Sequence, residues 1–336
     1  MDNLEKVDIV IPWVDGSDSK WQIKKRKYES AQNVSSDREY NGSMRYRDYG
    51  TLKYLFRSID KYAKWVNHVY LVTDNQKPAW INEDYSKMTV IDHKDFIPHE
   101  YLPTFNTNTI ELNVHRIESL SEKFVLLNDD MLFTSYTAVT DFFSNGLPVD
   151  NFCLSVMPTT DSFSHILLND MLAINRHFEK KEVLKKNWAK VFSFKNGKLL
   201  LRTFLTLPWP NLNGFYNPHL SISYTKDAYE QLWGLEFGKL NETSSHKIRS
   251  FEDLSDWAVR YFQLCSGEFE VGDPNKGKAY SLATIEELRQ EFLHRSKHKI
   301  ICINDVDEDS STIRKNVSEI QKLLSEKFPE KSGFEV

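Results

Sequence analysis

Short apolar runs that end in acidic or amide residues recur along the chain. The four strongest are VDIVIPWVDGSD (7–18), HVYLVTDNQ (68–76), KFVLLNDDMLF (123–133) and HKIICINDVDED (298–309), and MTVIDH (88–93) is a weaker fifth. Continuous apolar runs bounded by turn residues are typical of strands that are buried on both faces of a parallel sheet. We therefore predict a strand in each of these segments.

Helical periodicity fills the intervals between the predicted strands. Residues 49–64 place Leu52, Leu55, Phe56 and Ile59 on one face, and residues 108–120 do the same with Ile110, Val114 and Ile117. Spacings of three and four residues are typical of an amphipathic helix. Further helices are predicted at 225–236, 251–265, 283–295 and 312–328. Strands that alternate with helices indicate an α/β, doubly wound sheet.

Residues 165–218 have a different composition. RHFEKKEVLKKNWAK is strongly basic, and TLPWPNLNGFYNP is rich in proline, asparagine and aromatic residues. We interpret this segment as a helical insertion followed by a long loop. A chain of 336 residues can form two domains or one large domain with an insertion, and we predict a single domain over 1–336 that contains the insertion.

Charge and composition narrow the choice of partners. The formal net charge is −5, and the basic residues do not form a stripe interleaved with aromatics, so no nucleic-acid partner is expected. The amino terminus has no signal-peptide pattern, and no apolar run is long enough to span a bilayer, so we expect a cytoplasmic protein. The basic stretch from Lys180 to Lys190 is consistent with an anionic membrane or a lipid-pyrophosphate acceptor. A solvated helix face explains it slightly better, because Glu179 and Glu182 lie among its lysines.

Acidic and amide side chains follow the predicted strands. Ligands of open α/β sheets bind outside the carboxyl ends of the strands. That edge would collect Asp15, Asp18, Asp74, Asn128, Asp129, Asp130, Asn304 and Asp305. Converging carboxylates need a cation, a proton or basic partners, and hard oxygen ligands favour Mg²⁺ or Mn²⁺ over zinc. The alternative for each single residue is a helix cap or a turn.

Basic residues supply candidates for binding phosphate. Arg45 and Arg47 come just before a predicted helix, where an anion is favoured. An ion pair with Asp48 is the alternative. Arg249 precedes another helix, and His219 lies in a predicted loop, where it is either a general base or incidental.

The strand and helix segments resemble the Stealth family of polysaccharide phosphotransferases. VDIVIPWVDGSDSKW is similar to the first conserved block of that family. MRYRDYGTLKYLFRSIDKYAKWVNHVYLVTDNQKPAWI, continuing into FNTNTIELNVHRIESLSEKFVLLNDDMLF, is similar to the second. Residues 215–265 and the segment KIICINDVD resemble the third and fourth blocks, so the resemblance extends over roughly residues 7 to 307. The third block departs from the family pattern, because Ser221 and Ser223 replace the two prolines that usually follow His219.

The resemblance implies a fold, a reaction and partners. The fold would be a Rossmann-like, glycosyltransferase-A-like, mostly parallel sheet with flanking helices. The enzyme would transfer a sugar-1-phosphate from a UDP-sugar to a hydroxyl of a glycan acceptor, and UMP would leave. A lipid-linked oligosaccharide is the expected acceptor, with the enzyme at the inner face of the membrane. Two rivals stay open, a metal-dependent glycosyltransferase that releases UDP and a non-catalytic protein that binds nucleotide sugars.

The resemblance also implies roles for individual residues. The metal and the diphosphate would be held by Asp129, Asp130 and Asp305, and His219 would take the proton of the acceptor hydroxyl. His115 would orient the sugar or the diphosphate, unless it is a helix-surface residue paired with Glu111. The nucleotide and sugar pocket is assigned to Asp15, Gly16, Asp74 and Asn128, and the phosphate charge to Arg45, Arg47 and Arg249.

Overall fold

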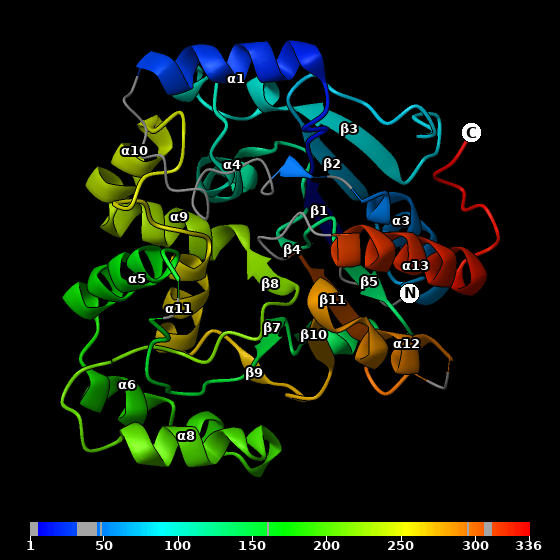
Figure 1. Cartoon of the computed structure of the whole chain (residues 1–336). Helices are drawn as coiled ribbons and strands as arrows, with labels where there is room; N and C mark the ends of the chain where they lie inside the picture. Colours follow the sequence, from blue (N-terminus) through cyan, green and yellow to red (C-terminus); the bar gives the residue numbers. More distant parts are fainter. Residues whose placement is uncertain (1–5, 32–45, 48, 160, 294–295, 306–310) are drawn as a thin grey trace.

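A five-stranded sheet occupies the centre of the molecule in the computed structural model (Figure 1), which describes residues 6–31, 46–47, 49–159, 161–293, 296–305 and 311–336. Its order is β3-β2-β1-β4-β8. The bounds are β1 (Val7–Pro12), β2 (Val69–Thr73), β3 (Met88–Asp92), β4 (Lys123–Leu126) and β8 (Ile222–Thr225). The first four strands are parallel, and β8 is antiparallel to β4. This order is that of a Rossmann-like sheet and confirms the predicted fold class.

Both faces of the sheet are buried, which explains why its strands are continuous apolar runs. Ile9 and Ile11 of β1 belong to one core, together with Leu55 of α3 (Thr51–Tyr62). Val10 belongs to the opposite core, together with Leu112 of α4 (Thr107–Asn113). Successive side chains of a strand point to opposite faces, so every position of β1 must be apolar or paired.

The fourth apolar run lies in a separate sheet. This sheet has the order β10-β11-β5, formed by β10 (Gly277–Ser281), β11 (Ile300–Asn304) and β5 (Met131–Phe133). The run 123–133 therefore forms two strands, β4 and β5, with the turn Asn128–Asp130 between them. The amide of Ile303 donates to the carbonyl of Asp130 at 3.0 Å. The carboxyl end of β11 thus meets that of β4, although the two strands belong to different sheets.

Helices cover the two faces of the central sheet (Figure 1). On one side α3 packs with α13 (Ser311–Lys327), next to α12 (Ile285–Leu293). The other side carries α4 and a helical layer formed by α5 (Ser164–His177), α9 (Lys226–Leu235), α10 (Phe237–Ser245) and α11 (Trp257–Ser266). A third small sheet joins β6 (Phe143–Ser144), β7 (Leu147–Asp150) and β9 (Glu270–Val271), and α1 (Ser19–Ala31) follows β1.

Three of the helices within residues 165–218 form a lobe that projects from the sheet at the lower end of Figure 1. They are α6 (Lys180–Lys186), α7 (Trp188–Val191) and α8 (Leu199–Thr206). A stretch without regular helix then leads to β8, and its Phe215 forms an isolated bridge with Leu154. Among the described residues, no helix combines the length and the apolar character needed to cross a membrane.

Candidate active site

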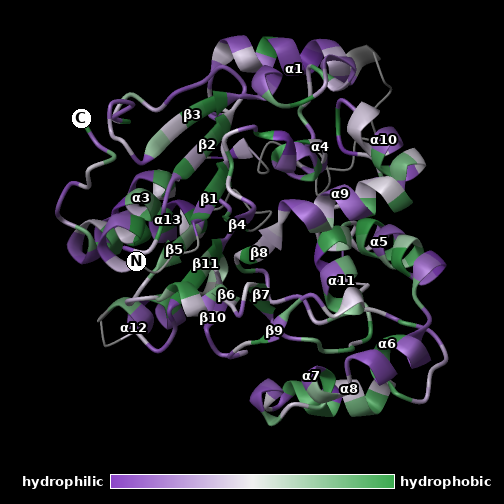
Figure 2. Cartoon of the chain, turned by 180° about the vertical axis from the view of Figure 1, so that it is seen from behind, coloured by the Kyte–Doolittle hydropathy of each residue, from purple (hydrophilic) through white to green (hydrophobic). Residues whose placement is uncertain are grey.

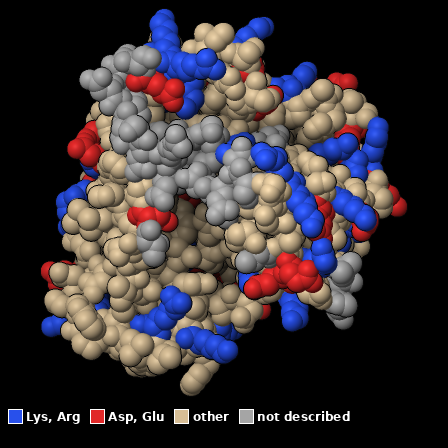
Figure 3. Space-filling model, in the orientation of Figure 1, with Lys and Arg blue, Asp and Glu red and all other residues tan. Residues whose placement is uncertain are grey.

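A cavity of ≈ 640 Å³ lies at the carboxyl ends of β1, β4 and β11. Figure 3 shows that the surface is hollowed near the centre of this face. Eight of the predicted site residues line the cavity, namely Arg47, Asp74, Asn128, Asp129, Asp130, His219, Arg249 and Asp305. The volume is within the range of small-molecule sites, and its position is the one expected for ligands of an open α/β sheet.

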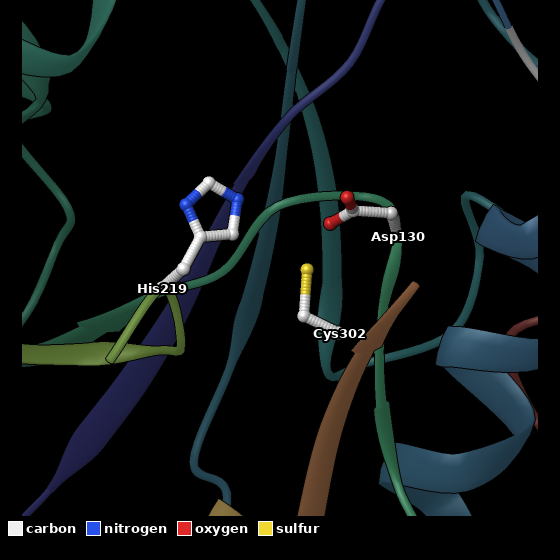
Figure 4. A group of neighbouring side chains, drawn as sticks. All are labelled: Asp130, His219 and Cys302. Carbon is white, nitrogen blue, oxygen red and sulfur yellow. The ribbon is translucent and has the colours of Figure 1, made fainter. Parts of the chain in front are cut away.

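Asp130, His219 and Cys302 form a group of potential metal ligands, and Asp130 and His219 of this group line the cavity. One ligand atom of each lies within 4.8 Å of the other two. Figure 4 shows the three side chains converging from the β4–β5 turn, the segment before β8 and β11. His219 has a φ of 51°, a left-handed conformation that is uncommon for residues other than glycine. Strained backbone of this kind is concentrated at functional sites, where the surrounding structure holds it in place.

The environment of Asp130 is suited to a cation. Burial and the negative charge of Asp305 raise the pKa of Asp130, and the nearby His219 opposes that shift. Its Oδ1 atom is buried and has no hydrogen-bond partner among the described residues. A positive ion bound by Asp130 and Asp305 would offset both the burial of the Asp130 charge and its repulsion from Asp305.

The thiol of Cys302 is held in its protonated form by its surroundings. Burial and the charge of Asp130 raise the pKa of the thiol well above its usual range, so the thiol keeps its proton. Its Sγ atom donates to Oδ1 of Asn304 at 3.0 Å. Without Cys302, the group offers a carboxylate oxygen of Asp130 and an imidazole nitrogen of His219. Carboxylate oxygens suit Mg²⁺ or Mn²⁺.

A tyrosine and an arginine hold the carboxylate of Asp305. The hydroxyl of Tyr49 donates to Oδ1 of Asp305 at 2.8 Å. Nη1 of Arg47 lies 3.8 Å from Oδ2 of Asp305 and 3.4 Å from the Tyr49 hydroxyl. The Arg47 side chain therefore borders the cavity next to an acidic group, and its contact with a phosphate stays a prediction.

A second acidic pair, Glu111 and Asp256, lines the same cavity, together with Arg249. Glu111 is 8% exposed and Asp256 is 5% exposed, and both line the cavity. Burial and the charge of Asp256 raise the pKa of Glu111 well above its usual range, and Arg249 lowers it in part. Burial raises the pKa of Asp256 to about 6, although the Tyr224 hydroxyl donates to its Oδ2 at 2.8 Å. Carboxyl groups with shifted pKa values in a cavity are candidates for binding or proton transfer.

Our sequence analysis did not identify Tyr49, Cys302 or Asp256 as site residues, and it named Glu111 only as a partner of His115. For Glu111 a signal existed, because a carboxylate three residues before Val114 lies on the apolar side of the predicted helix. A charge on that side must be paired or lie at a site. Asp256 lies within the predicted helix 251–265, and nothing in its sequence context distinguishes it from a surface acid.

Three predicted residues lie outside the cavity lining. The carboxylate of Asp15 accepts from the amide and hydroxyl of Ser17 at 2.9 and 2.6 Å, so it closes a turn. Gly16 packs against the backbone of Tyr46, where a Cβ atom would lie 2.0 Å from the carbonyl oxygen. His115 is buried and stacks on Tyr229 at 5.1 Å between ring centroids.

The pocket roles of Asp15, Gly16 and His115 stay predictions. Burial lowers the pKa of His115 to about 3, so this imidazole is neutral. Asp74 does line the cavity, where it pairs with Lys24 at 2.7 Å. Arg45 lies outside the described residues.

A mostly parallel sheet whose carboxyl edge gathers carboxylates, arginines and a histidine around one cavity is typical of an α/β transferase. Comparison with protein-family models identifies Stealth protein CR1, conserved region 1, at residues 5–32, and Stealth protein CR2, conserved region 2, at residues 45–149.

Relatives match over essentially the whole chain. The capsular polysaccharide phosphotransferase WcwK of Streptococcus pneumoniae is 39% identical, with 100% of this chain and 99% of the relative covered. The exopolysaccharide phosphotransferase cps2G of Lactiplantibacillus plantarum is 39% identical, with 98% and 96% covered. The receptor polysaccharide phosphotransferase WefC of Streptococcus gordonii is also 39% identical, with 99% and 100% covered. The chain therefore belongs to the Stealth family and is a transferase of the phosphotransferase class.

Among solved structures, the galactosyltransferase LgtC in complex with donor and acceptor sugar analogs is similar over 95% of both chains. The sequence identity is 9% and the TM-score is 0.43.

Proposed function

We propose that this enzyme transfers a hexose-1-phosphate or N-acetylhexosamine-1-phosphate from a UDP-sugar to a hydroxyl of a glycan acceptor in the synthesis of capsular or cell-wall polysaccharide. The observation that carries the proposal is the approach of Asp130 and His219 within 4.8 Å, in a cavity also lined by Arg47 and Arg249. Its relatives are named as phosphotransferases of surface polysaccharides, which supports the reaction class.

The reaction forms one phosphorus–oxygen bond and breaks another. The acceptor hydroxyl oxygen attacks the β-phosphorus of the UDP-sugar, and the bond between that phosphorus and the bridging oxygen breaks. UMP leaves with the bonding electron pair, and the product is a phosphodiester between two sugars. The hydroxyl proton passes to His219, which the left-handed turn holds at the cavity surface. Transfer of this kind depends on positioning and on charge neutralisation, for which Arg47 and Arg249 are available.

The carboxylates of Asp130 and Asp305 would hold Mg²⁺ or Mn²⁺. The bound ion would neutralise charge on the diphosphate oxygens. In this proposal Asn128 and Asp129 contact the diphosphate, and Asp74 contacts the nucleotide or sugar hydroxyls. The proposed acceptor is a lipid-linked oligosaccharide, and the proposed location is the cytoplasm, at the inner face of the membrane.

The nucleotide released in the reaction tests the proposal. Purified enzyme is incubated with Mg²⁺ or Mn²⁺, a panel of UDP-hexoses and a short oligosaccharide acceptor, and the products are separated by chromatography. We expect UMP from the wild type, and none from His219→Ala or Asp130→Asn. The matched control His99→Ala removes an exposed histidine that does not line the cavity, and it should leave UMP release unchanged. Release of UDP would instead identify a conventional glycosyltransferase.

A further inference from the structure

Helix α8 is folded with its polar side toward the protein and its apolar side toward solvent. Thr203 and Thr206 are buried, whereas Leu201, Phe204 and Leu205 are 64, 52 and 65% exposed. A surface helix of a globular protein normally has the opposite arrangement. The exposed leucines and phenylalanine therefore need an explanation beyond chance placement.

Specific hydrogen bonds fix this orientation. The Thr203 hydroxyl accepts from the amide of Leu154 at 3.2 Å, which ties the inner side of the helix to the body of the protein. At the end of α8, the buried ammonium of Lys180 donates to the carbonyls of Thr206 and Trp209 at 2.7 and 2.6 Å. These bonds satisfy carbonyl groups that a helix terminus leaves without partners. The outward face of α8 is thus built into the fold.

The exposed face of α8 continues into α7 and the flanking loops. Trp188, Phe194 and Trp209 are 65, 94 and 55% exposed. Ring contacts connect the surface, with Trp188 and Phe192 at 4.5 Å and Phe192 and Phe204 at 5.6 Å between centroids. Figure 2 shows α7 and α8 as largely hydrophobic at the tip of the lobe. We call the exposed residues the α8 patch, which comprises Trp188, Phe194, Leu201, Phe204, Leu205 and Trp209.

Beyond Glu182 in the first turn of α6, the charged residues of this lobe are all basic. Residues 183–211 contain Lys185, Lys186, Lys190, Lys195, Lys198 and Arg202 and no aspartate or glutamate, in a chain whose net charge is −5. In Figure 3 lysine and arginine side chains gather at the lower end of the face, where Figure 1 places α6 and α8. The lobe is therefore complementary to an anionic surface, whereas the protein as a whole is not.

We propose that the α8 patch docks the enzyme onto a bilayer that contains anionic lipid. Tryptophan, phenylalanine and leucine beside lysine and arginine are the composition of segments that lie in the membrane interface. The apolar side chains would enter the boundary between head groups and acyl chains, and the basic residues would meet the anionic head groups. A lobe that projects from the body, as α6–α8 does in Figure 1, can reach a flat surface without obstruction. Docking requires neither donor nor metal, so it is independent of the proposed reaction.

Vesicle binding by the full-length protein tests this proposal. We expect the wild type to co-sediment with phosphatidylglycerol–phosphatidylcholine vesicles, and to bind more weakly at high salt because screening weakens attraction to head groups. The triple variant Leu201→Ser/Phe204→Ser/Leu205→Ser should lose at least tenfold in partition coefficient. Lys195→Glu/Lys198→Glu should lose binding to anionic vesicles in particular. The control Leu235→Ser/Phe237→Ser changes residues that are 49 and 61% exposed on another surface, and it should bind as the wild type does.

Two outcomes would overturn membrane docking. One is vesicle binding by the triple variant that equals wild-type binding, or no binding by the wild type. The other is a dimer of the wild type by light scattering that becomes monomeric in the triple variant while vesicle binding stays unchanged, which would make the α8 patch an interface between copies. Nucleotide release with a short, soluble acceptor should be the same in wild type and triple variant. That assay separates failure of docking from failure of the proposed reaction.

Discussion

The hydroxyl of Tyr49 donates a hydrogen bond of 2.8 Å to the carboxylate of Asp305, across 256 residues of sequence. Tyr49 lies within the region that matches Stealth conserved region 2, and Asp305 follows β11. The bond therefore connects the end of β11, in the sheet β10-β11-β5, to the segment just before α3. The position of the Asp305 carboxylate in the cavity depends on it.

Tyr49→Phe should weaken the response of the enzyme to divalent metal. A hydrogen bond to a charged group contributes about 1.5–3 kcal/mol, so its loss should raise the Mg²⁺ concentration for half-maximal activity by about tenfold or more. Activity measured over a Mg²⁺ titration checks this. Tyr54→Phe in the helix that follows Tyr49 is the control, because Tyr54 does not line the cavity. An unchanged Mg²⁺ dependence of Tyr49→Phe would contradict the metal role of Asp305.

Arg260→Met should destabilise the protein by about 3–5 kcal/mol, the usual effect of breaking a buried ion pair. Arg260 is 2% exposed and binds Asp150 through Nε at 2.6 Å and Nη2 at 2.9 Å, which connects α11 to the end of β7. Urea unfolding measures the change. The control Lys64→Met removes an exposed pair with Asp60 and should cost less than about 1 kcal/mol. If both variants cost the same, the Arg260 pair does not carry the stability assigned to it.

The apolar pattern of the sequence predicted most of the sheet, because a strand that is buried on both faces needs an apolar residue at nearly every position. It also placed Asn128, Asp129, Asp130 and Asp305 at strand ends, and these residues line one cavity. The pattern could not show that the run 123–133 bends at Asn128–Asp130 and enters a second sheet, since Met131 to Phe133 are as apolar as β4. Sheet membership depends on pairing with β11, which is distant in sequence.

The direction in which a side chain points was the second feature that the sequence could not predict. His115 lies on a helix whose buried face is wide, and only the packing of α9 shows that its ring stacks on Tyr229. The segment LLLRTFLT lies within the predicted insertion and forms α8, yet apolar periodicity would place its leucines inside. The buried Lys180 and Thr203 reverse that orientation, and their partners come from other segments.

Asp256→Asn should change how stability depends on pH. The pKa of Asp256 is raised to about 6, so its carboxyl contributes stability that is present below its ordinary pKa of 3.8 and is lost as the pH rises through about 6. Asparagine does not titrate, so the variant does not lose this stability as the pH rises. Relative to wild type, the variant should gain on the order of 2–3 kcal/mol in unfolding free energy between pH 4 and pH 7.5. Urea unfolding at both pH values checks it, with the exposed Asp84→Asn as the control. A parallel pH dependence of wild type and Asp256→Asn would contradict the raised pKa.

Glu111→Gln should separate activity from stability. The pKa of Glu111 is raised well above its usual range by burial and by Asp256, so the cavity disfavours its charged form and the carboxyl lowers stability at neutral pH. Glutamine keeps the shape without the charge, and the unfolding free energy at pH 7.5 should therefore stay equal or increase. If Glu111 exchanges a proton or binds a substrate hydroxyl, kcat/KM should fall at least about a hundredfold. A group with only a structural role would show the opposite pattern, with the unfolding free energy lowered and kcat/KM unaffected. Measuring both quantities on the same preparation, with Glu118→Gln outside the cavity as control, decides between them.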